Sequence, residues 1–201
     1  MRFNEGSVNV IVLIVLFLIV VFLGKLFIDF SDRKNLVYGK KKARHALLNF
    51  AKVRSYKLFS NITIDYNGVK THFDYLVVGF FGLLAVNVLE PVGEYCGEEN
   101  QDKWVYSNEK IRDYIENPIK QNNDALVALK KIIGKELNTY KFTLESVTVF
   151  GGKPNKTPIY TKALDKVCYA KKLAKYLQDG KFGIDNDVDV EAVSNLITKY
   201  L

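Results

Sequence analysis

Residues 62–90 constrain the fold more than any other part of the chain, because their pattern predicts three consecutive strands. Asn67 and Gly68 readily supply the two positive-φ positions of a tight hairpin, so residues 62–66 and 70–78 are expected to pair antiparallel. A second break at Gly79 and Gly82 precedes residues 83–89, an almost wholly apolar run that is typical of a strand covered on both faces. The sequence therefore predicts a central sheet.

Asn87 is the polar exception within the apolar run. A buried amide without partners costs roughly 1–3 kcal/mol, so its presence in a central strand requires an explanation. Because side chains alternate along a strand, Asn87 and Leu89 share one face, while Glu90 points to the other.

Composition indicates one globular domain with an appendage. The chain has 201 residues, is 48% hydrophobic and 25% charged, and carries a net charge of +7. This charge favours a polyanionic partner, either nucleic acid or an anionic lipid surface. Cys96 and Cys168 form no CxxC or Cys/His grouping, so neither a disulfide framework nor a structural zinc site is indicated.

The N-terminal part predicts a membrane anchor. Residues 8–28 are apolar except for Asn9, Gly24 and Lys25, and about 20 apolar residues cross a hydrocarbon core of roughly 30 Å. A cleaved signal peptide is the alternative, but no small-x-small cleavage site follows. The predicted organisation is a short tail (1–7), a single transmembrane helix (8–28), a basic juxtamembrane linker (29–37) and one domain (38–201).

Basic residues follow the apolar segment in excess over those before it. The positive-inside bias therefore places the N-terminus outside and the domain in the cytoplasm. Four of these residues begin the predicted helix 38–54: Lys40, Lys41, Lys42 and Arg44. They could contact anionic headgroups, at about 1 kcal/mol per basic residue, or nucleic acid. Both interpretations remain open from the sequence.

Further elements are predicted downstream. Residues 91–113 are expected to be irregular, with Trp104, Val105 and Tyr106 forming either a short strand or a loop that caps the core. Asn117 and Pro118 are expected to open a helix that ends near Gly134. On that helix, Asn117, Gln121 and Asp124 are expected to lie together on the polar side. The remaining predictions are a strand at 143–150, a short strand at 159–160, a basic helix at about 162–177, and a terminal helix at about 190–201 capped by Asp189.

The order of these elements resembles the nuclease-related domain (NERD), a branch of the PD-(D/E)xK restriction-endonuclease-like fold. The matching segments are residues 73–78, residues 82–89, Trp104 and residues 117–121. The resemblance covers most of residues 38–201 and implies an α/β fold with a mixed sheet flanked by helices. It also implies a nuclease centre in which two carboxylates hold Mg²⁺ and a lysine orients the attacking water.

Three family positions carry that chemistry, and they correspond here to Asp74, Asn87 and Leu89. Asn87 and Leu89 replace the expected Glu and Lys, so only Asp74 is retained, and Mg²⁺ binding through it is expected to be weak or absent. Gln121 occupies a further family position. The first helix also carries Arg44 and His45 near the place where the family often has a Glu.

Structural roles explain several of these residues almost as well. Asp74 beside His72 could be an ordinary hydrogen-bonded residue of a strand, and capping or solvation accounts for Gln121. Three functions therefore remain open: an inactive nuclease-like domain that binds DNA or RNA, an active nuclease with relocated ligands, and a membrane protein that contacts only lipid or protein. The first is preferred on the resemblance and the net charge.

Overall fold

The computed structural model describes residues 14–26, 38–138 and 142–201. The chain divides into two compact units, Met1–Tyr38 and Gly39–Leu201. In the first unit, residues 14–26 form a helix whose large apolar side chains are exposed. No helix within the described ranges combines the length and apolar character needed to cross a membrane, so the predicted transmembrane helix is not supported. Residues 1–13 and 27–37, with the tail, the linker and both ends of segment 8–28, lie outside the described ranges.

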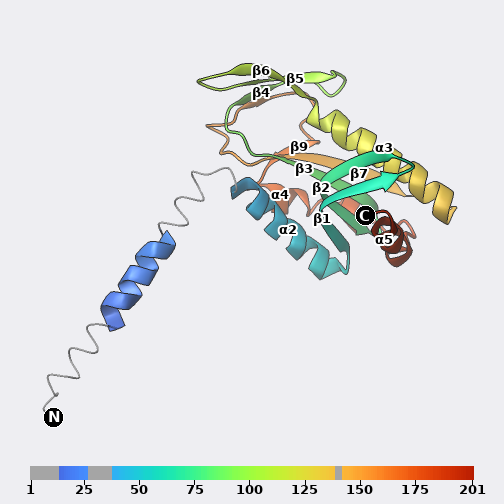
Figure 1. The fold of residues 1–201 in the computed structure, drawn as a ribbon, viewed down its shortest axis with the longest axis horizontal. Coiled ribbons are helices and arrows are strands. Elements are labelled where there is room, and N and C mark those ends of the chain that lie inside the picture. The colour runs from blue at the N-terminus through green and yellow to red at the C-terminus, as the bar shows by residue number, and fades with distance from the viewer. Residues whose placement is uncertain (1–13, 27–37, 139–141) are drawn as a thin grey trace, which may run out of the picture. The chain divides into compact units, whose positions relative to one another are not determined.

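A five-stranded mixed sheet forms the centre of the second unit (Figure 1). Its strand order is β1-β2-β3-β7-β9, with antiparallel pairing from β1 to β3 and parallel pairing from β3 to β9. The strands are β1 (Lys57–Tyr66), β2 (Val69–Gly79), β3 (Gly82–Leu89), β7 (Thr143–Phe150) and β9 (Val167–Tyr169).

The three-strand prediction for residues 62–90 is confirmed. Asn67 and Gly68 adopt φ of 54° and 80° at the β1–β2 turn, the left-handed conformation that such a hairpin requires. β3 lies between β2 and β7, and its residues from Gly82 to Val86 are all buried. An interior strand has neighbours on both edges and cover on both faces, which explains its apolar sequence.

Helices cover both faces of this sheet (Figure 1). Leu84, Val86 and Val88 of β3 join the core beneath α2 (Tyr38–Arg54) and α4 (Leu173–Tyr176). Leu83 and Ala85 point the other way, into the core beneath α3 (Pro118–Leu137) and α5 (Val190–Lys199). The alternation along β3 thus divides the domain into two apolar layers.

A second, four-stranded mixed sheet lies near the start of α3 (Figure 1). Its order is β6-β5-β4-β8, from β4 (Glu94–Cys96), β5 (Lys103–Ser107), β6 (Arg112–Glu116) and β8 (Ile159–Tyr160). Trp104 and Tyr95 fill a third core with Phe150. Within residues 91–113, the short strand considered for Trp104 to Tyr106 is confirmed as part of β5. The prediction that the rest is irregular is wrong for β4 and the start of β6, because strands this short carry no periodic signal and β4 pairs with β8, distant in sequence.

Two helix predictions also need correction. The expected helix at 162–177 is instead β9 and the four-residue α4, because Val167, Cys168 and Tyr169 pair in parallel with β7. α3 continues past Gly134 to Leu137 and ends where Asn138 takes φ 51°. The terminal helix is confirmed, with Asp189 accepting a hydrogen bond from the Ala192 amide; a short 3-10 turn, η1 (Gly180–Gly183), lies before it.

Candidate functional site

Asp74 lies where β2 separates from β3. The β2–β3 ladder pairs Tyr75 with Val86 and extends no further toward the start of β2. The Val88 amide therefore has no backbone partner on β2 and instead donates to Oδ2 of Asp74 at 2.8 Å. A buried amide must be satisfied, and Val88 is buried, so this carboxylate oxygen has a structural task.

The other carboxylate oxygen of Asp74 faces Lys40. The Lys40 ammonium lies 3.3 Å from Oδ1, and the side chains are 45% and 13% exposed for Lys40 and Asp74 respectively. His72 adds a second nitrogen, since its Nε2 lies 3.9 Å from the same oxygen while its Nδ1 is 3.2 Å from Oγ1 of Thr63. Asp74 is thus surrounded by nitrogen atoms of Val88, Lys40 and His72.

Three contacts hold the backbone of Gly39 and Lys40 in the first turn of α2. The Lys40 carbonyl accepts a hydrogen bond from the Tyr75 hydroxyl at 3.1 Å, and its amide donates to Oε1 of Glu90 at 3.3 Å. Next to it, Gly39 approaches Gly151 so closely that a Cβ on Gly39 would lie 2.5 Å from the Gly151 Cα. The first turn of α2 is therefore fixed against β2, β3 and the end of β7.

A polar pocket of about 530 Å³ opens beside Asp74. It brings together three of the four residues predicted for the catalytic site, since Asp74, Asn87 and Gln121 all line it. Asp124 and Asn122 of α3 line it too, and no sequence pattern predicted that Asn122 would lie there. The other lining residues come from β2 and α3: Val69, Lys70, Thr71, His72, Ala125 and Ala128.

Leu89 is not among the residues lining that pocket. Its side chain packs against the third core with Trp104 and Phe150. Leu89 therefore contributes to packing and not to the pocket. Glu90 points away as strand alternation predicts, toward the first turn of α2, where it accepts the Lys40 amide.

The basic residues at the start of α2 have different surroundings. Lys40 pairs with Asp74, whereas Lys42 lines a different pocket, together with His45 and residues of α4. Arg44 lies on the exposed face of α2. A helix distributes consecutive residues around its axis, so adjacent lysines necessarily face different surroundings.

Asn117 was expected on the polar side of α3, but it is only 1% exposed. Its Oδ1 accepts from the amides of Ile119 and Lys120, and its Nδ2 donates to the carbonyls of Glu98, Glu99 and Gln101. Asn117 therefore joins the helix to the loop between β4 and β5 and takes no part in the pocket. Gln121 and Asp124 do share the pocket, as the helical spacing suggested.

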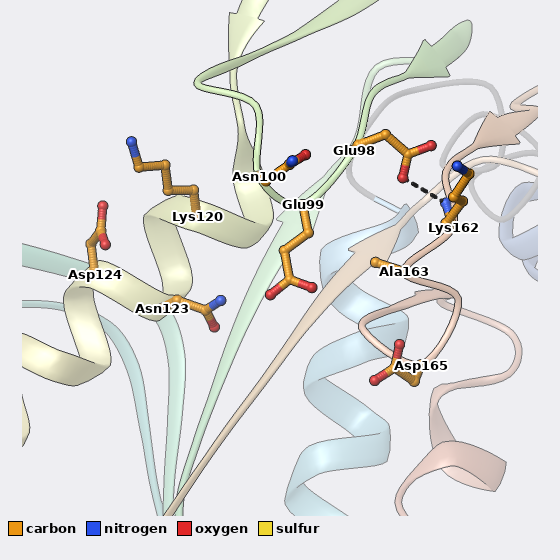
Figure 2. Close-up of a pocket in the computed structure, with 9 residues that line it drawn as sticks. All are labelled: Glu98, Glu99, Asn100, Lys120, Asn123, Asp124, Lys162, Ala163 and Asp165. Atoms are coloured by element: carbon orange, nitrogen blue, oxygen red, sulfur yellow. Dashed lines mark hydrogen bonds between the residues drawn. The ribbon is translucent and has the colours of Figure 1, made fainter.

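A second pocket, of about 770 Å³, lies beside the first and shares Asp124 with it (Figure 2). Glu98, Glu99 and Asp165 also line it, against only Lys120 and Lys162. Figure 2 shows Glu99 extending between α3 and the segment that carries Ala163 and Asp165. The carboxylates outnumber the lysines, so this side of α3 does not favour a phosphate backbone.

The residues beside Asp74 do not fit a conventional Mg²⁺ centre. Such a centre needs several oxygen ligands, including one or more carboxylates, in octahedral geometry. Within the described ranges, no group of three or more His, Cys, Asp or Glu side chains is arranged to hold a metal ion. The carboxylate of Asp74 is instead paired with the Lys40 ammonium.

Comparison with known proteins identifies the family. No curated protein and no solved structure matches this chain significantly. The family model described as nuclease-related domain matches residues 37–151, more than half of the chain, and this region contains Lys40, Asp74, Asn87, Leu89 and Gln121. On this match, and with a mixed α/β sheet flanked by helices, the chain belongs to the nuclease-related domain (NERD) family.

Proposed function

We propose that this protein is a nuclease-related domain that has lost metal-dependent cleavage and retains binding of nucleic-acid phosphates. The observation that carries the proposal is the Lys40–Asp74 pair, with 3.3 Å between Nζ and Oδ1. Lys40 supplies positive charge where the family's chemistry would use a divalent cation. The site would then be a restriction-endonuclease-like centre in which the Lys40 ammonium takes the place of the metal ion.

Loss of cleavage follows from what the neighbouring residues can do. Asn87 offers a neutral oxygen where a carboxylate would bind the metal, and Leu89 can neither take a proton nor donate to a phosphate. Any Mg²⁺ held through Asp74 would have to displace the Lys40 ammonium, so its binding should be weak.

Binding of DNA or RNA is supported by the groups around the pocket. Lys40, Lys70 and His72 bring positive charge or donors to it, and the amides of Asn87 and Gln121 can donate to phosphate oxygens. The net charge of +7 adds long-range attraction. The carboxylate of Asp124 opposes this attraction. Because the attraction itself is electrostatic, the affinity for nucleic acid should depend strongly on salt.

A cleavage assay tests the loss of activity. The full chain, purified in an uncharged detergent, is incubated with single- and double-stranded DNA and RNA in Mg²⁺ or Mn²⁺. We expect no cleavage above that of an Asp74→Ala variant. Cleavage by the unaltered chain that Asp74→Ala abolishes would contradict the proposal.

A binding assay tests the retained function. Fluorescence anisotropy with labelled oligonucleotides should show an affinity that falls linearly with salt on logarithmic axes, with a slope of about −0.7 to −0.9 per phosphate contacted. Lys70→Gln should weaken binding, whereas Lys175→Gln on α4, outside the Asp74 pocket, should change it little. No binding at low salt would exclude a nucleic-acid partner.

An active nuclease with relocated ligands is the second candidate, and one contact favours it. Lys40 contacts two carboxylates: its amide donates to Glu90, and its ammonium pairs with Asp74. In that case Lys40 would replace the missing lysine and Glu90 the missing Glu. Metal-dependent cleavage that Glu90→Gln and Lys40→Gln both abolish would establish this alternative.

We further propose that residues 8–28 anchor the domain to a membrane, with the N-terminus outside and the domain in the cytoplasm. The support is the apolar sequence and the excess of basic residues after it. Alkaline extraction of membranes should leave the full chain in the pellet and release a variant that lacks residues 1–28. If both were released, contact with anionic lipid through the basic residues would be the remaining route to a membrane.

A further inference from the structure

A separate pocket of about 280 Å³ lies between α2 and residues 170–178. It shares no lining residue with the Asp74 pocket. The two pockets also belong to different layers: α2 and α4 pack on one face of the five-stranded sheet, and α3 packs on the other. A ligand in this pocket, here called the α2–α4 pocket, would therefore not compete directly with one beside Asp74.

The charged groups of the α2–α4 pocket are all basic. Lys42, His45 and Arg54 reach it from one face of α2, and Lys171 reaches it from the turn before α4. Among the described residues that line it, there is no Asp or Glu. Asn49 and Gln178 add two amides. This arrangement contrasts with the pocket of Figure 2, where carboxylates predominate.

The interior of the α2–α4 pocket is apolar and is kept open by small residues. Ala46, Ala170 and Ala174 line it, and their side chains end at Cβ. Phe50 forms part of the wall, with the Arg54 guanidinium 4.7 Å from its ring centroid. Stacking on an aromatic ring orients the guanidinium plane, and a planar fork suits two oxygens of one phosphate.

We propose that the α2–α4 pocket binds a phosphate monoester carried on a small carbon skeleton. A monoester has a charge of about −1.5 to −2 at pH 7, which matches several convergent cations better than a monoanion does. The alanines and Phe50 would contact the carbon skeleton. The volume is just below the range of about 300–1,000 Å³ that is usual for ligand pockets, so the ligand is a small molecule or a headgroup.

Calorimetry on the full chain in an uncharged detergent tests this site. The probes are glycerol 3-phosphate as a soluble monoester, short-chain phosphatidic acid as a lipid monoester, and sulfate and short-chain phosphatidylcholine as controls. We expect both monoesters to bind and both controls to bind at least about tenfold more weakly. Sulfate is a dianion without a carbon skeleton to contact the alanines and Phe50, and phosphatidylcholine has a skeleton but no net negative charge. Tighter binding of phosphatidic acid would identify a lipid headgroup as the source, and equal or weaker binding would identify a soluble ligand.

Charge-matched variants locate the binding. Lys171→Gln should lower the affinity for glycerol 3-phosphate by roughly tenfold, because one charge-assisted contact is lost. Lys175→Gln removes the same charge outside the pocket and should change this affinity less than about twofold. Lys70→Gln, in the Asp74 pocket, should also have no effect. Ala174→Trp leaves the charge unchanged and should abolish binding by filling the space, with circular dichroism reporting that the fold is intact.

Two results would overturn the proposal. One is equal affinity for sulfate and glycerol 3-phosphate, which would indicate an unspecific anion site. The other is monoester binding that persists in a folded Ala174→Trp variant, which would place the ligand elsewhere.

Discussion

The ammonium of Lys40 lies 3.3 Å from Oδ1 of Asp74, which lines the polar pocket with Asn87 and Gln121. The other oxygen of Asp74 accepts the Val88 amide at the end of the β2–β3 ladder. One carboxylate oxygen of Asp74 therefore satisfies a backbone amide, and the other pairs with an ammonium.

Removing the Lys40 ammonium should make Asp74 more available to metal. We expect Lys40→Gln to gain measurable Mn²⁺ binding in calorimetry and to change the free energy of unfolding by less than about 1 kcal/mol, because the pair is partly exposed. Lys52→Gln, on an exposed face of the same helix, is the control. No gain of Mn²⁺ binding would mean that Lys40 does not block the site.

A second carboxylate introduced into the Asp74 pocket should create a response to metal that the same charge elsewhere does not. Asn87→Glu places a negative charge beside Asp74, so we expect a lower melting temperature without metal and a rise when Mn²⁺ is added. Ser60→Glu, on an exposed part of β1, should show no response to Mn²⁺. An equal response of the two variants would argue against a metal position between Asn87 and Asp74. Leu89→Lys should destabilise instead, because Leu89 packs against the third core.

The close approach of Gly39 and Gly151 should not tolerate a side chain. In Gly39→Ala the new Cβ would lie 2.5 Å from the Gly151 Cα, so α2 must shift, at a cost of about 1–3 kcal/mol. The shift should also displace Lys40 and weaken oligonucleotide binding. Gly180→Ala is the matched control, since nothing lies within 4 Å of its added Cβ. Urea unfolding and anisotropy measure the two effects.

Asn117 should contribute more to stability than an ordinary helix cap. Asn117→Ala removes the acceptor for two amides and the donor to three carbonyls, and we expect a loss of about 2 kcal/mol or more. Asp189→Ala removes one capping bond on α5 and should cost about 1 kcal/mol. Similar losses in urea unfolding would show that the loop contacts of Asn117 are replaced by water.

Local patterns were sufficient to predict the elements that the chain specifies locally. Asn67-Gly68 predicted the hairpin, the apolar run predicted β3, and Asn117-Pro118 predicted the start of α3. Strand alternation also predicted that Glu90 points away from Asn87. In each case the signal is a turn preference, a cap or a side-chain period, which depends only on neighbouring residues.

The tertiary structure decided the partners. Only folding brings Lys40 of α2 to Asp74 of β2, pairs β9 with β7, and turns Leu89 into a core residue. These contacts join segments distant in sequence, and their energies depend on burial and on the groups that happen to face each other. The sequence alone therefore determined the family resemblance and singled out Asp74, Asn87 and Gln121, whereas the structure showed that these three share a pocket and that the Lys40 ammonium faces Asp74.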